Sequence, residues 1–104
     1  MKRPPRRSRR PIMRVLDLLG RRWALRVLWE LRDGPLTFRA LREACDEVSP
    51  SSLNQRVTEL RGLGVVELGD AGYGLTPAGA RLSRILLDLS RWAEDALRDP
   101  RTAK

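Results

Sequence analysis

Residues 49–64 restrict the fold of this chain more than any other stretch. A serine and a proline suited to a helix start open the segment, and two glycines close it: Ser49, Pro50, Gly62 and Gly64. Between them, Leu53, Val57 and Leu60 recur at helical spacing. The pattern predicts a helix of about residues 49–62 that buries one apolar face.

The opposite face of this helix carries short hydrogen-bonding side chains. At about 100° per residue, Ser51 and Gln55 point away from the apolar stripe, with Asn54 and Thr58 on one side of them and Ser52 and Glu59 on the other. Such a face could contact base edges in a DNA major groove. The alternative is an ordinary surface helix, so the neighbouring segments decide between the two interpretations.

The positive charge of the chain is concentrated at its start. The 104 residues carry a formal net charge of +8. Residues 1–10 hold six basic side chains and no acid, whereas the remaining 94 residues hold fifteen basic and thirteen acidic ones. We therefore expect a single domain of nearly neutral charge at residues 11–98, preceded by a disordered basic arm and followed by a tail at 99–104. The arm either binds DNA, along the phosphates or in a minor groove and through residues such as Arg6 and Arg7, or only aids solubility.

Catalysis, cofactor binding and membrane insertion have little support in the composition. The chain has no histidine, one cysteine and no glycine-rich phosphate loop, paired-carboxylate motif or metal-ligand cluster. We therefore expect no enzyme activity and no cofactor. Cys45 ends an apolar stripe and is expected to be a buried structural thiol. The absence of any possible intramolecular disulfide and of a long apolar run favours a cytoplasmic protein, associated with the nucleoid if it binds DNA.

The other segments predict a mainly α fold with a small β-hairpin. Short helices are expected at about 12–19, 23–31 and 37–45. The second of these is apolar on nearly all sides, so it should lie at the centre of the domain with Trp23 and Trp29 in the core. Strands at 65–68 and 73–75 would form a hairpin, with Leu36-Thr37 as a minimal third strand, before a long helix from Pro77 to about Leu97. This order is that of a winged helix-turn-helix domain with a long C-terminal helix.

The sequence resembles the HxlR family of bacterial winged-helix transcriptional regulators from about residue 11 to residue 97. The similar pieces are Leu-Asp-Leu-Leu-Gly-Arg-Arg-Trp (16–23), Leu-Trp-Glu-Leu-Arg-Asp-Gly-Pro (28–35), Thr-Phe-Arg-Ala-Leu (37–41), Ser49-Pro50, Leu-Asn-Gln-Arg-Val-Thr-Glu-Leu (53–60), Leu-Gly-Val (63–65) and Tyr-Gly-Leu-Thr-Pro-Ala-Gly (73–79). The resemblance implies a dimeric regulator, expected here to be a repressor, that binds operator DNA.

The sequence departs from the family pattern in two places. Many members have a redox-sensing or electrophile-sensing cysteine just before the proline that opens the first helix, where this chain has Arg10. A thiol switch of that kind is therefore not expected. The family wing is usually longer and basic at its tip, whereas this tip is Gly69-Asp70-Ala71-Gly72. We therefore expect the wing to contribute little to DNA binding.

The expected DNA contacts come from two helices and the arm. Ser51, Ser52, Asn54 and Gln55 are expected to approach bases, with Thr58 beside a phosphate; the carboxamides of Asn54 and Gln55 suit adenine. Arg56 flanks the apolar stripe, so it either reaches a phosphate, which the resemblance favours, or pairs with an acid such as Glu43 or Asp46. Arg39 and Arg42 are either phosphate clamps or solvated surface charges.

The terminal helices are expected to hold a homodimer. Their apolar residues would otherwise form an exposed patch, which soluble monomers rarely tolerate; they are Ile12, Val15, Leu16, Leu19, Leu86, Leu89, Trp92 and Ala93. A two-fold dimer predicts a pseudo-palindromic operator. Two other functions stay open, a winged-helix module that binds a protein partner and, with less support, binding of structured RNA through the arm. The sequence does not identify any small-molecule effector.

Overall fold

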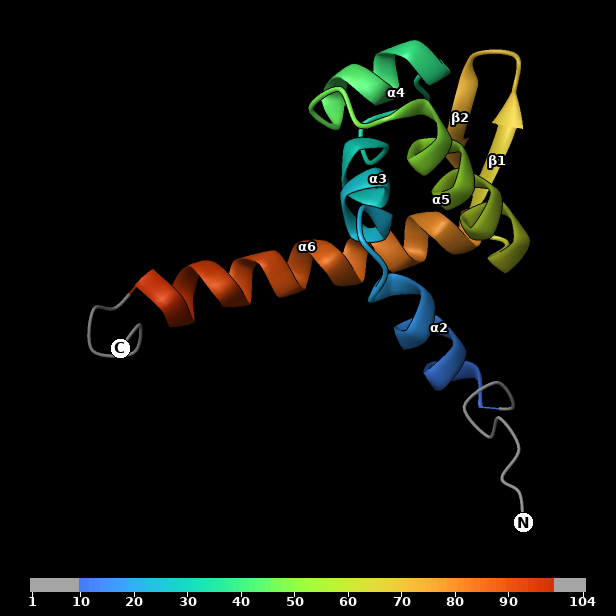
Figure 1. Ribbon diagram of the computed structural model, residues 1–104. Helices are drawn as coiled ribbons and strands as arrows, with labels where there is room; N and C mark the ends of the chain where they lie inside the picture. Colours follow the sequence, from blue (N-terminus) through green and yellow to red (C-terminus); the bar gives the residue numbers. More distant parts are fainter. Residues whose placement is uncertain (1–9, 99–104) are drawn as a thin grey trace.

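The computed structural model describes residues 10–98, so Arg6, Arg7 and the predicted tail lie outside the described residues. The elements are α2 (Pro11–Leu19), α3 (Ala24–Glu30), α4 (Phe38–Ala44), α5 (Pro50–Leu63), β1 (Val66–Gly69), β2 (Gly72–Leu75) and α6 (Pro77–Arg98). The order confirms the predicted winged helix-turn-helix fold with a long C-terminal helix (Figure 1). Across residues 10–98, no helix has the length and apolar character needed to span a bilayer.

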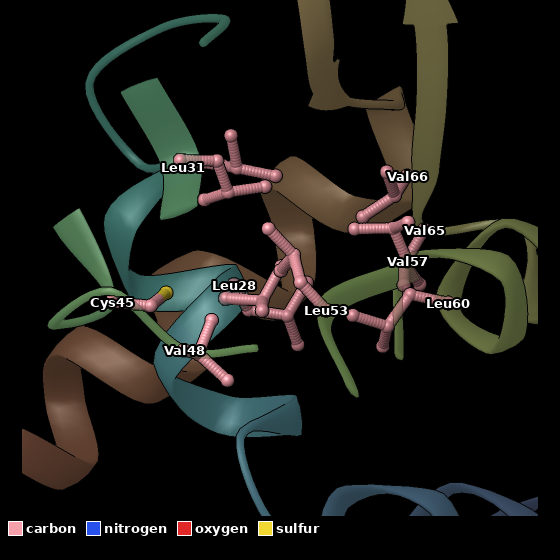
Figure 2. Packing of buried hydrophobic residues seen from close by; sticks show 11 residues of the cluster. Leu28, Leu31, Cys45, Val48, Leu53, Val57, Leu60, Val65 and Val66 are labelled. Atoms are coloured by element: carbon pink, nitrogen blue, oxygen red, sulfur yellow. The ribbon is translucent and has the colours of Figure 1, made fainter. Parts of the chain in front are cut away.

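The core is built around α3 and α5, with the turn after α4 and the start of the hairpin closing its sides (Figure 2). Leu53, Val57 and Leu60 of α5 are at most 1% exposed, and they pack with Leu28 and Leu31 of the α3 region. Burial of this kind contributes about 1.5–3 kcal/mol for each large apolar side chain. The stripe on α5 therefore fixes which face of this helix is left for solvent.

Each helix that begins after a Ser or Thr is capped by that residue. The hydroxyl of Ser49 accepts a hydrogen bond from the Ser52 amide (3.2 Å), and that of Thr37 accepts one from the Ala40 amide (3.1 Å). At the other end, α5 continues through Gly62 and stops at Leu63, one residue later than predicted. Gly64 ends it in a left-handed conformation with φ of 91°.

The wing is a short antiparallel hairpin tied to both the helix-turn-helix and α6. Val66 pairs with Leu75, and Gly69 pairs with Gly72 across the turn. An isolated bridge between Leu36 and Tyr73 confirms the minimal strand before α4. Gly72 has φ of 118° and lies directly on the Leu36 carbonyl, so any larger residue there would collide with backbone.

The central helix is less enclosed than its sequence predicts. Val27 and Leu28 of α3 are buried, but Leu25 is 41% exposed and Trp29 is only half-buried. The expectation that Trp29 lies in the core is therefore wrong; instead, the Arg32 guanidinium lies 4.1 Å from the centre of its ring. Trp23 precedes α3 with φ of 76°. Its side chain is partly buried and packs against the outside of the core.

The exposed side of α3 faces α6 across an open apolar groove. The groove has a volume of about 420 Å³ and is lined mainly by Leu25, Trp29, Leu86, Leu89 and Ala93. It explains the incomplete burial of α3, because α6 crosses this side of the domain at an angle and covers only part of it (Figure 1).

The two terminal helices extend away from the core (Figure 1). In α6 only Gly79 and Ser83 are buried, and α2 has no buried residue. Of the eight side chains predicted to form a dimer interface, four are exposed, namely Ile12, Leu16, Leu89 and Trp92. The other four are partly buried, namely Val15, Leu19, Leu86 and Ala93.

Candidate nucleic-acid interface

The outward face of α5 presents polar side chains to solvent. Ser51, Asn54, Gln55 and Thr58 are exposed, and Ser52 is half-buried. The side-chain hydrogen bonds between residues 10–98 include none from these five side chains. Their donors and acceptors are therefore available to an external partner, while the buried stripe on the opposite face holds the helix in place.

Arg61 belongs to the same surface, although the sequence motifs did not predict it. It is exposed in the last turn of α5. At about 100° per residue it lies only about 20° around the helix from Asn54. The seven-residue spacing from Asn54 is a signal that could have identified it. Its position suits a phosphate beside the groove rather than a base, because it lies near the end of the helix.

Arg56 is occupied by contacts within the protein. Its side chain is 16% exposed. Its Nε donates a hydrogen bond to the carbonyl of Arg22 (2.9 Å), and one terminal nitrogen donates to Oε1 of Glu59 (2.6 Å). This geometry agrees with the structural alternative for Arg56, with Glu59 as the paired acid in place of Glu43 or Asp46. The phosphate contact stays a prediction.

Glu59 lies on the same flank of α5 as Arg56 and is held between two arginines. Its second oxygen, Oε2, accepts a hydrogen bond from Arg21 (2.8 Å), and its side chain is 22% exposed. Arg21 follows Gly20 in the connection between α2 and α3. No linear pattern in the sequence identifies this pairing, because it depends on how that connection packs against α5.

The two arginines predicted on α4 differ in their surroundings. Arg42 donates from Nε to the carbonyl of Val48 (2.7 Å) and pairs with Glu47 (3.5 Å), so it stabilises the turn between α4 and α5. Arg39 is exposed and has no ion pair with another residue of the described range. Arg39 is therefore the α4 side chain better placed to meet a phosphate.

The turn between α4 and α5 is also held from α3. Asp46 and Glu47 both adopt left-handed conformations, with φ of 59° and 60°. Arg26 donates to the carbonyl of Ala44 (2.7 Å), to Glu30 (2.8 Å) and to Asp46 (3.2 Å). The hydrogen bond to Glu30 is the main reason that the pKa of Arg26 is raised. This cation therefore fixes the angle between the two helices of the motif.

The wing tip carries a carboxylate, Asp70, instead of a cation. Residues 66–75 include Glu67 and Asp70 and no basic side chain, and both acids are exposed. A phosphate would be repelled there. The structure therefore places the cationic and hydrogen-bonding groups on α4 and α5, apart from the hairpin.

Cys45 is fully buried at the end of α4, as predicted. Desolvation raises the pKa of its thiol, and the cation of Arg26 opposes this effect only partly. The thiol is therefore protonated near neutral pH and poorly reactive. Between residues 10 and 98 there is also no group of three or more acidic or cysteine side chains that could hold a metal ion.

A capped helix with a free polar outer face, a preceding helix at a fixed angle and a hairpin beside them define a winged helix-turn-helix DNA-binding protein. Comparison with known families identifies the family of winged helix-turn-helix proteins concerned. The family described as HxlR-like helix-turn-helix matches residues 18–100, and the chain belongs to this family of DNA-binding transcriptional regulators.

Individual relatives agree with this assignment. The HTH-type transcriptional regulator YodB of Bacillus subtilis is 31% identical over 87 residues, which span 77% of this chain and 78% of YodB. YvaP of the same organism, also named an HTH-type transcriptional regulator, is 29% identical over 89 residues (79% and 82%). The quinone-bound crystal structure of YodB superposes with a TM-score of 0.74 at 30% identity, covering 81% of this chain and 96% of that one. A possible HxlR family factor from Thermoplasma volcanium gives 0.70 at 27% identity (82% and 83%).

Proposed function

We propose that this protein binds a pseudo-palindromic operator as a homodimer, with α5 in the major groove, and represses transcription by occupying that site. The observation that carries the proposal is the outer face of α5, where the side chains of Ser51, Asn54, Gln55 and Thr58 are exposed and form no side-chain hydrogen bond with any residue of the range 10–98. Asn54 and Gln55 can each contact adenine through two hydrogen bonds. Arg61 and Arg39 supply phosphate contacts on either side.

The dimer part of the proposal rests on exposed apolar surface. Ile85, Leu89, Trp92 and Leu97 of α6 are each more than half exposed, and so are Ile12 and Leu16 of α2. Soluble monomers rarely present so many large apolar side chains on their surface. Two-fold pairing covers the same surface in both subunits and places two α5 helices in successive major grooves, with half-site centres roughly 10 bp apart or a multiple of that.

Selection of bound sequences from random double-stranded DNA tests this function directly. We expect an enriched inverted repeat and an affinity that falls steeply with salt, because phosphate binding releases counterions. A reporter placed behind the selected site should then be silenced when the protein is expressed. An activated reporter would contradict repression while leaving operator binding intact.

A different result would favour a different partner. The nearly neutral fold and the acidic wing tip are compatible with a module that binds a protein instead. Failure to enrich any DNA sequence over a variant in which Asn54 and Gln55 are both replaced by alanine would support that alternative. Preferential binding of structured RNA through the arm would contradict the proposal in a distinct way.

A further inference from the structure

The connection between α2 and α3 is fastened to α5, the proposed recognition helix, by a chain of polar contacts. Arg21 donates to Oε2 of Glu59 (2.8 Å), Oε1 of Glu59 accepts from Arg56 (2.6 Å), and Arg56 donates to the carbonyl of Arg22 (2.9 Å). Glu59 is the central member, because each of its two oxygens serves a different arginine. The chain therefore closes a loop between two residues of the connection and two residues of α5.

We call these contacts of Arg21, Arg56 and Glu59 the clamp. It acts on α2, a helix that has little contact with the core. No residue of α2 is buried, and only Leu18 and Leu19 at its end pack against the core. The connection contains Gly20 and then Trp23, whose left-handed φ of 76° turns the chain sharply. Since apolar burial fixes α2 so weakly, the direction in which α2 leaves the domain depends on the fastening of residues 20–23.

We infer that Glu59 is a positioning residue that sets the angle between the dimer-forming helix α2 and the recognition helix, and thereby the half-site spacing that the dimer accepts. The inference rests on the proposed function, since it requires a two-fold dimer on DNA. Glu59 itself needs no contact with a base for this role. Its paired carboxylate orients Arg21 and Arg56 and is neutralised by them beside a polyanion.

Spacing is the quantity that such a clamp controls. Inserting one base pair moves a half-site by about 3.4 Å and rotates it by about 34° around the duplex axis. A dimer with a fixed angle between α2 and α5 fits one spacing, whereas a dimer with a loose connection fits several. Loss of the clamp should therefore broaden the range of accepted spacings more than it weakens the best one.

The decisive variant is Glu59→Gln, which keeps the shape of the side chain but loses the charge and puts an N–H group where an oxygen accepted. A second variant, Arg21→Gln, removes the ion pair between Arg21 and Glu59 and leaves both contacts of Arg56, with Glu59 and with the Arg22 carbonyl, in place. Glu43→Gln is the matched control, because it removes one exposed carboxylate of α4 that has no ion pair with any residue from 10 to 98.

Affinity is measured for operators whose central spacing is changed by one and two base pairs, with thermal unfolding and sedimentation as checks on folding and dimerisation. For residues coupled in one network, interaction energies of about 0.5–3 kcal/mol correspond to roughly 2- to 150-fold. Wild type should bind the operator with its best spacing more tightly than the altered operators. We expect this ratio of affinities to decrease at least about threefold in Glu59→Gln and in Arg21→Gln, which lies within that range. Glu43→Gln should keep the wild-type preference.

Each outcome has a separate meaning. If both clamp variants fold, dimerise and keep the wild-type spacing profile, the inference is wrong and the proposed function stands. If wild type itself shows no spacing preference, two-fold operator binding is wrong. Should Glu59→Gln fail to fold, the profile of Arg21→Gln decides the question alone.

Discussion

Helices α5 and α6 carry apolar stripes of the same kind, but they place them in different environments. Leu53, Val57 and Leu60 of α5 are at most 1% exposed, whereas Leu89 and Trp92 of α6 are 55% and 61% exposed. The first stripe completes the core of the domain. The second extends past the domain and has only part of its length covered (Figure 1). The stripe on α5 stabilises the fold, and the stripe on α6 is available for association.

The largest expected effect comes from placing charge on the α6 stripe. Leu89→Asp combined with Trp92→Asp should weaken dimerisation and operator affinity by about 100-fold or more, because central apolar anchors contribute about 2 kcal/mol or more each. Sedimentation velocity and DNA titration measure the two quantities. Arg91→Asp is the control, since it places a carboxylate on the same helix outside the stripe. Wild-type protein that sediments as a monomer at micromolar concentration would refute the dimer.

The same truncation on the two helices separates their roles most directly. Leu60→Ala should lower the free energy of unfolding by about 2–5 kcal/mol, because it leaves a cavity in the core. Leu89→Ala, measured in a Trp92→Asp background to suppress dimerisation, should change it by less than about 0.5 kcal/mol. Chemical denaturation gives both values. Equal losses at the two positions would mean that α6 packs within its own domain as tightly as α5 does.

Gln55 and Arg56 are neighbours in α5, but Gln55 lies on its outward face and Arg56 on the flank that contacts the rest of the domain. Replacing each one separates DNA recognition from stability. Gln55→Ala should cost about 1–3 kcal/mol of operator affinity and relax the preference at one or two base pairs. Arg56→Ala should instead lower the unfolding temperature and leave sequence preference intact, because Arg56 binds Glu59 and the Arg22 carbonyl. If Arg56→Ala weakened binding to every DNA sequence equally without changing stability, the result would support the prediction that Arg56 contacts a phosphate.

Removal of the basic arm tests how much affinity lies outside α5. A chain without residues 2–10 should bind all sequences more weakly, and the slope of log affinity against log salt should flatten by about 0.9 for each phosphate that the arm neutralises. Sequence preference should persist, because phosphate contacts carry no base information. An unchanged slope would show that the arm, including Arg6 and Arg7, only aids solubility.

The smallest effect is expected at Cys45. Its thiol pKa is raised by burial, so the unfolded chain ionises first as pH rises. The stability contributed by the neutral thiol is therefore present below the unfolded pKa and lost as pH rises through the folded one. Cys45→Ala should remove this alkaline slope in denaturation experiments while operator binding is retained. Peroxide inactivation that Cys45→Ala abolishes would reveal a thiol switch.

Local sequence signals determined most of the elements and one face of the candidate site. Capping residues, glycines and helical spacing placed the helices and the hairpin to within one or two residues, since these features act over one or two turns. The same spacing identified Ser51, Asn54, Gln55 and Thr58 as the outward side of α5, because three buried residues at fixed angles define the opposite side. Family membership also followed from the order of short motifs.

Only the tertiary structure decided where the flanking charges and the tryptophans went. Arg56 and Glu59 lie at angles that are neither buried nor outward, so their partners depend on which segment packs beside them, and that segment is the connection at residues 20–23. Trp29 likewise looked like a core residue, yet α6 covers only part of its side of α3. The periodicity of a helix shows which face is apolar, whereas the burial of that face depends on elements distant in sequence. For α6, no element of the described chain covers the outer part of its apolar stripe.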